Sequence, residues 1–146
     1  GVAMAAQHED AKVIEVQMLN QNPDDRSQRM VFYPDLVRAN VGDTIRFVST
    51  DKGHNSESSK DMLPEGAEGW KGPISQDLEV TLTQDGTYGY HCTPHATLGM
   101  VGLILVGDAM VNFQAARDVR QRGRAADRYE DIFARAEAML AEEKPA

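Results

Sequence analysis

The sequence predicts an all-β sandwich followed by two C-terminal α-helices. Between residues 12 and 107, short segments rich in β-branched and aromatic residues alternate with turn signals, as in sandwich proteins. From residue 108 to residue 143 the apolar residues recur with a helical period instead. The length of 146 residues is that of one domain of ordinary size.

The first predicted strand covers residues 12–19, KVIEVQML, where apolar and polar side chains roughly alternate. The segment QNPDDRSQ that follows has the composition of a loop. A second short strand, residues 30–34, ends at Pro34, because proline cannot donate a backbone hydrogen bond. After an extended segment that begins at Leu36, further strands are expected at residues 44–49, 78–83, 87–92 and 100–107.

The stretch from residue 51 to residue 73 is rich in glycine and proline and has no clean period. We therefore expect a long loop with one helical turn near Asp61 to Leu63. Long loops in compact domains are often functional.

Two helices are predicted at residues 108–123 and 124–143, separated by Gly123. In the second helix one apolar stripe consists of Tyr129, Ile132, Phe133, Ala136 and Leu140. This stripe favours packing on the sandwich over binding a partner or a membrane surface. The expected organisation is a flexible N-terminus (1–12), a sandwich (13–107) and a helical pair (108–146) in the same domain.

Composition excludes several classes of protein. No apolar run approaches the roughly 18 to 20 residues that a transmembrane helix needs. A net charge of −8 argues against nucleic acid as a partner. The single cysteine, Cys92, excludes an intrachain disulfide framework and the usual structural zinc sites.

The segment YHCTPHATLGM, residues 90–100, contains Cys92, His95 and Met100. Strand side chains alternate between faces, so a Cys92 that points inward leaves His91 pointing outward. His95 and Met100 follow in a tight loop that can present a thiolate, an imidazole and a thioether around one point. His54, which follows a strand and a glycine, is the natural fourth member.

One cysteine, two histidines and one methionine form the ligand set expected for a blue-copper electron-transfer site. Each residue alone has a simpler explanation, since a lone strand-end cysteine is usually a buried small hydrophobe. It is the joint pattern that favours one copper ion per chain.

The segments TDKGHN, GTYGYHCTPH and GMVGLILVGD resemble the pseudoazurin family of the cupredoxins, small blue-copper proteins. The resemblance implies a Greek-key sandwich of about eight strands with His54, Cys92, His95 and Met100 as copper ligands. It also implies that Asn55 ties the two ligand loops together. By the same resemblance the chain is a periplasmic, monomeric electron carrier, its signal peptide removed, that donates to a copper nitrite reductase in denitrification.

In this fold the outer edge of His95 should reach the surface as the electron port. We expect an apolar collar and an outer ring of positive charge around it, which steers an acidic partner. His91 adds charge to this docking face at low pH. The predicted collar is Pro94, Ala96, Leu98 and Met30, and the ring is Lys52, Lys60 and Lys71.

Two other functions fit the sequence less well. A copper carrier or storage protein usually has an open site with several methionines or cysteines, whereas the methionines here are scattered. A copper enzyme needs a second, substrate-binding copper, and only two of the four histidines remain after His54 and His95.

Overall fold

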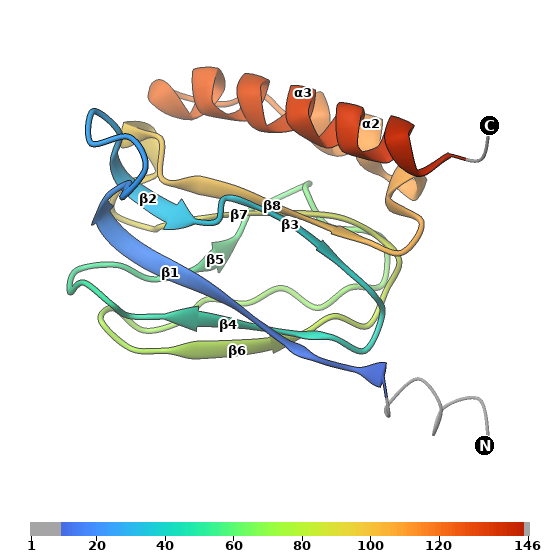
Figure 1. Ribbon diagram of the computed structural model, residues 1–146, viewed down its shortest axis with the longest axis horizontal. Coiled ribbons are helices and arrows are strands. Elements are labelled where there is room, and N and C mark those ends of the chain that lie inside the picture. Colours follow the sequence, from blue (N-terminus) through green and yellow to red (C-terminus); the bar gives the residue numbers. More distant parts are fainter. Residues whose placement is uncertain (1–9, 145–146) are drawn as a thin grey trace.

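Two β-sheets pack face to face in the computed structural model, which describes residues 10–144, and helices cover one outer face (Figure 1). The first sheet has the order β2-β1-β4-β6, made of β1 (Val13–Gln21), β2 (Arg29–Tyr33), β4 (Thr44–Val48) and β6 (Leu78–Thr81). The second has the order β3-β8-β7-β5, made of β3 (Leu36–Ala39), β5 (Glu57–Ser58), β7 (Gly86–His91) and β8 (Val101–Val106). The predicted all-β sandwich with two C-terminal helices is confirmed.

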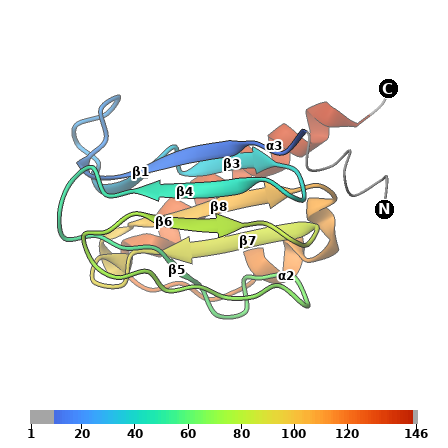
Figure 2. The same cartoon turned by 90° about the horizontal axis from the view of Figure 1, so that it is seen from below.

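Each sheet contains one parallel pair. β1 runs parallel to β4 and β3 runs parallel to β8, while the other neighbouring strands are antiparallel. Figure 2 shows β1, β4 and β6 side by side, with the second sheet behind them. The arrows of β4 and β7, which belong to different sheets, finish at the same end of the sandwich, where β8 begins (Figure 2).

The long predicted loop at residues 51–73 contains an element that its composition did not predict. Glu57 and Ser58 form the two-residue strand β5, which pairs with His91 and Tyr90 of β7. Instead of a helical turn near residue 61, a hydrogen-bonded turn joins the amide of Met62 to the carbonyl of Ser59. Of the predicted flexible N-terminus, residues 1–9 lie outside the described residues.

The first predicted helix, residues 108–123, is wrong in its extent. It consists of a 3₁₀ turn, η2 (Ala109–Val111), and the short helix α2 (Phe113–Arg117). Between them the side chain of Asn112 accepts a bond from the amide of Thr87 at 2.7 Å and donates to its carbonyl at 2.8 Å. This long-range pairing with β7 interrupts the local helix, as side-chain bonds to backbone often do.

The apolar side chains form two clusters. One fills the space between the sheets and includes Phe32, Phe47 and Tyr90. The other lies between the second sheet and the helices, where α3 (Arg124–Glu143) buries Tyr129, Ile132, Phe133 and Ala136 of the predicted stripe, with Leu140 partly buried. Among the described residues, no helix is both long enough and apolar enough to cross a membrane.

Tyr129 attaches α3 to the sheet. Its buried hydroxyl lies 3.0 Å from the carbonyl oxygen of Tyr90 and 2.9 Å from that of Gly102, and it donates to this pair of acceptors. Tyr90 and Gly102 face each other across β7 and β8. On the inner face the Tyr90 ring covers Gly102, since a Cβ there would lie 2.2 Å from the Tyr90 hydroxyl oxygen. The β7–β8 pair is thus held from both sides.

Tyr129→Phe removes the hydroxyl that donates to the carbonyl oxygens of Tyr90 and Gly102. We expect the free energy of unfolding to fall by about 1–3 kcal/mol, measured by urea denaturation of the copper-free protein. Tyr33→Phe is the control, because the Tyr33 hydroxyl contacts Asp24 at the surface. The control should stay within about 0.5 kcal/mol of the parent; equal losses in the two variants would contradict a structural role for the Tyr129 hydroxyl.

The same variant has a predictable pH dependence. Burial raises the pKa of Tyr129, so the folded protein keeps a proton that the unfolded chain releases above a pKa of about 10. This stabilisation is complete below that pH and is lost as the pH rises above it. Between about pH 9 and 11 the stability of Tyr129→Phe should therefore fall less steeply than that of the parent.

Candidate metal centre

Three side chains with metal-binding atoms converge at the end of the sandwich where β4 and β7 finish. They are His54, Cys92 and His95, and their ligand atoms lie within 4.8 Å of one another. His54 and Cys92 are completely buried, whereas His95 is partly exposed. Among the described residues this is the one group of His, Cys, Asp and Glu side chains arranged so as to hold a metal ion.

Backbone hydrogen bonds shape the segment from residue 92 to residue 100 into a closed loop. The amide of Cys92 donates to the carbonyl of Met100 at 3.0 Å, and the amide of Met100 donates to that of His95 at 3.2 Å. The amide of His95 in turn donates to the carbonyl of Cys92. A 3₁₀ turn, η1 (Ala96–Leu98), lies within the loop. Met100 is fully buried in the same cluster as Cys92.

The distances between the donor atoms fit a single first-row metal ion. Nδ1 of His54 lies 3.2 Å from Nδ1 of His95, and Sγ of Cys92 lies 3.9 and 3.5 Å from these two nitrogens. Such an ion binds nitrogen at about 2.0–2.1 Å and sulfur at about 2.3 Å, so donor atoms around it lie roughly 3–4 Å apart. A thiolate and two imidazoles favour copper over hard cations such as magnesium.

The ring of His54 is oriented by a residue that the sequence analysis missed. Nε2 of His54 lies 2.7 Å from Oδ1 of Asn20, near the end of β1, so this nitrogen donates and Nδ1 faces the other two donors with its lone pair. The backbone amide of Asn20 is bound by Asp51, which precedes His54 in the same loop. Burial, with the nearby His95, lowers the pKa of His54 and favours the neutral imidazole that metal binding requires.

The thiol of Cys92 lies in an environment that disfavours ionisation by the protein alone. Burial raises its pKa, although the backbone amides of Asn55 and His95 oppose this effect. A bound cation reverses the balance, because a coordinating thiol is deprotonated by the metal.

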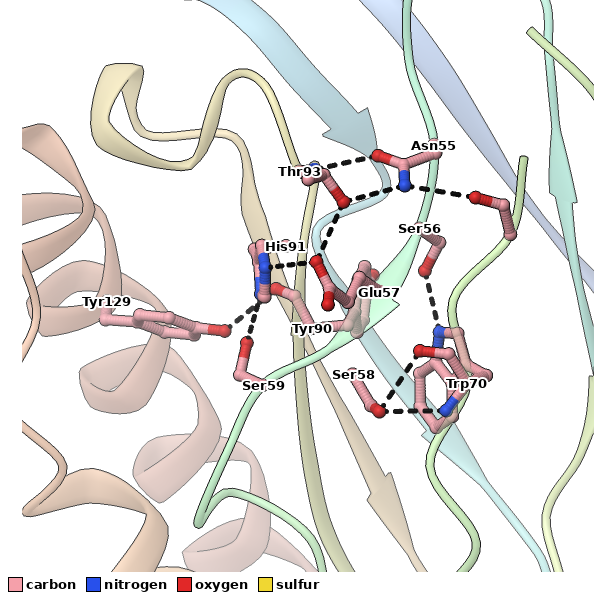
Figure 3. A network of polar contacts seen from close by, with 11 residues as sticks. Asn55, Ser56, Glu57, Ser58, Ser59, Trp70, Tyr90, His91, Thr93 and Tyr129 are labelled. Carbon is pink, nitrogen blue, oxygen red and sulfur yellow. Dashed lines mark hydrogen bonds and ion pairs between the residues drawn. The ribbon is translucent and has the colours of Figure 1, made fainter. Parts of the chain in front are cut away.

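Asn55 connects the loop of His54 to the loop of Cys92. Its Nδ2 donates to the hydroxyl of Thr93 at 2.8 Å and to the carbonyl of Gly72 at 3.1 Å, while its Oδ1 accepts from the amide of Thr93 at 2.7 Å. Figure 3 shows Asn55 beside Thr93, with its amide turned towards both loops. The loop of His54 leads from β4 of the first sheet into β5, which pairs with β7 of the second, so the bonds between Asn55 and Thr93 continue this pairing to the metal-binding end.

Comparison with known proteins agrees with this geometry. Residues 18–107 match the family model of copper binding proteins of the plastocyanin/azurin family. The pseudoazurin of Paracoccus pantotrophus is 48% identical over 114 residues, 78% of this chain and 77% of that protein. The chain belongs to the pseudoazurins.

Two further relatives extend the likeness to almost the whole domain. The pseudoazurin of Methylorubrum extorquens is 42% identical over 85% of this chain and 82% of its own. A solved structure of a pseudoazurin from Sinorhizobium meliloti superposes with a TM-score of 0.82 and 43% identity, covering 86% of this chain and 97% of that one. As a pseudoazurin, the chain is a copper-containing electron carrier that passes electrons to partner proteins.

In this pseudoazurin the predicted apolar collar is only partly at the surface. Pro94 and Leu98 are exposed, Ala96 is partly exposed, and Met30 lies in β2, partly buried against the core between the sheets. His91 points outward as strand parity predicts, but its ring is bound by Glu57 at 3.0 Å and Ser59 at 2.7 Å.

Exposed cations lie beside the ligand loop, and some of them were not predicted from the sequence. Lys52, Lys60 and Lys71 are all exposed, and Lys60 lines a surface hollow with Ala96 and His91. Arg120 and Arg122 line the same hollow from the segment before α3. They come close to the ligand loop only through the folding of the C-terminal segment, so position in the sequence gave no signal.

Asn20→Leu removes the acceptor for His54 Nε2 while it keeps a side chain of similar size. Because partners of metal-binding histidines fix ring orientation, copper affinity should fall by about tenfold or more. Competition with a copper chelator measures this. Asn20→Asp keeps an acceptor and should remain within about threefold of the parent; an unchanged affinity in Asn20→Leu would show that the contact does not orient the ring.

Proposed function

We propose that His54, Cys92, His95 and Met100 bind one copper ion, and that the chain is a periplasmic electron donor to a copper nitrite reductase in denitrification. The observation that supports the ligand set best is the convergence of the two Nδ1 atoms and Sγ within 4.8 Å. Met100 completes the set because its backbone is bonded to both Cys92 and His95. The thioether of Met100 would add a soft, weak donor to the set.

Copper, when bound, supplies a one-electron couple between Cu(I) and Cu(II). The chain's own residues exclude water and hold the donor atoms in place. His54 and Cys92 have no exposed surface, and their loops are joined by Asn55. Fixed donors keep the rearrangement on electron transfer small. This closed arrangement favours an electron carrier over a copper carrier, which needs an exchangeable site.

His95 is the side chain through which electrons pass to a partner. It is the one partly exposed member of the buried centre, and the exposed Pro94 and Leu98 lie beside it in the chain. An apolar surface of this kind allows close, short-lived contact between redox proteins. Exposed cations suit a partner with an acidic face. Lys60, Arg120 and Arg122 line a hollow together with Ala96, and Lys52 and Lys71 are the other exposed members of the predicted ring.

The ligand assignment predicts an intense visible absorption. Titrating the copper-free protein with Cu(II) should produce a thiolate-to-copper band that saturates at about one copper per chain and is bleached reversibly by a reductant. Cys92→Ser should lose the band, because a serine hydroxyl does not provide the thiolate. A pale spectrum from the parent protein would contradict copper binding by Cys92.

The docking proposal predicts an effect of charge on rate. Lys60→Glu should slow the reduction of a copper nitrite reductase by roughly threefold to tenfold at low ionic strength, and added salt should reduce the difference. Lys12→Glu is the matched control, because Lys12 is bonded to Thr44 at the start of β4, the opposite end of the sandwich. Equal slowing in the two variants would show that net charge, and not this surface, determines the rate.

A further inference from the structure

The residues on either side of Cys92 contact the same carboxylate oxygen. Oε1 of Glu57 accepts a hydrogen bond from the hydroxyl of Thr93 at 2.8 Å and lies 3.0 Å from Nε2 of His91. Glu57 reaches both because β5 pairs with β7 and places Glu57 opposite His91. Figure 3 shows Glu57 between His91 and Thr93. A single carboxylate oxygen therefore contacts both the residue before Cys92 and the residue after it. The thiol of Cys92 points the other way, into the core.

The bond from Thr93 to Glu57 also decides how Thr93 meets Asn55. A hydroxyl has one hydrogen and two lone pairs. Since an ionised carboxylate only accepts, the Thr93 hydroxyl donates to Glu57 and accepts from Nδ2 of Asn55. The Thr93 amide completes the link by donating to Oδ1 of Asn55. Glu57 is thus the outer end of a directed chain of hydrogen bonds that leads to the loop of His54.

Glu57 also fixes the ring of His91. Nδ1 of His91 lies 2.7 Å from the hydroxyl of Ser59, so the ring is bound on both sides. Burial opposes ionisation of Glu57, but the hydrogen bond from Thr93 and the proximity of His91 and Lys71 outweigh this effect and lower the pKa of Glu57. An ionised acceptor forms hydrogen bonds roughly twice as strong as a neutral one.

We infer that Glu57 is a positioning residue for the copper site, which fixes the backbone on both sides of Cys92 through Thr93 and His91. The inference rests on the proposed role of Cys92 as a ligand. It predicts that the direction of the thiol is determined by the protein before copper binds. It also predicts that Glu57 acts mainly through Thr93, which is joined to both Glu57 and Asn55.

The test compares Glu57→Ala and Glu57→Gln with Glu79→Gln. The control removes the same charge from a strand of the other sheet, where Glu79 is paired with Arg46. In the copper-free protein, hydrogen exchange of the Thr93 amide should become about tenfold faster in Glu57→Ala and remain unchanged in the control.

In the copper-loaded protein, Glu57→Gln and Glu57→Ala should change the relative intensities of the thiolate bands and speed copper loss by about threefold to tenfold.

A double-mutant comparison tests the route through Thr93. If Glu57 acts through this residue, Glu57→Ala combined with Thr93→Val should accelerate copper loss no more than Thr93→Val alone. Thr93→Ser keeps the hydroxyl, so its spectrum should match that of the parent, unlike the spectrum of Thr93→Val. Fully additive effects would overturn the route through Thr93.

The outcomes separate this inference from the proposed function. A parent protein without thiolate bands would overturn the ligand assignment and, with it, the role given to Glu57. A parent with these bands, together with Glu57 variants that match Glu79→Gln in exchange, spectrum and copper loss, would overturn the inference alone. Glu57→Gln keeps the size of the side chain, so the comparison does not depend on the folding of Glu57→Ala.

Discussion

The buried amide of Asn55 is the contact on which the arrangement of the metal-binding end depends. The pairing of β5 with β7 ends at Glu57 and His91, and Asn55 extends the contact to the residues next to His54 and Cys92. Asn55 is 2% exposed; two of its three hydrogen bonds reach Thr93 in the loop of Cys92, and the third reaches Gly72. Leaving a buried amide unpaired is costly, and the loops are therefore held at one separation.

The aromatic core next to the ligand loops provides a rigid support. Tyr90 packs edge-on against Phe32 and Phe47, with ring centroids 4.8 and 5.0 Å apart, and Trp70 covers the same cluster. Such close packing leaves little room for side chains to move. Because Tyr90 precedes Cys92 by two residues on the same face of the strand, this packing limits how far the thiol can shift. An electron carrier benefits, since a change of charge then meets a structure that rearranges little.

The sequence was informative where local pattern and tertiary structure agree. Strand parity correctly predicted that an inward Cys92 leaves His91 facing outward, and Tyr88 and Tyr90 are buried in the same cluster as Cys92. The helical stripe of α3 was also recognisable, because its apolar side chains recur with the helical period and four of its five members are fully buried. The types and spacing of residues in the sequence also predicted His54, Cys92 and His95, which the fold brings together.

What the sequence could not predict depends on contacts between distant segments. Asn20 meets His54 across 34 positions, and Glu57 meets Thr93 across 36. Neither belongs to a local motif, and a strand of two residues such as β5 is too short to have a period. The first helix was predicted too long for the same reason, since the pairing of Asn112 with Thr87 across 25 positions replaces local helical bonds.

The junction between α3 and the ligand loop limits how the site can be redesigned. Gly123, the residue before α3, has a φ of 59° and lies so close to the ligand loop that a Cβ there would be 2.6 Å from the carbonyl oxygen of Thr97. The length of the ligand loop and the position of α3 therefore cannot be changed separately. Grafting a ligand loop from a cupredoxin that lacks the C-terminal helices would bring a new backbone against this glycine. The loop and the start of the helix form one module, to be exchanged together.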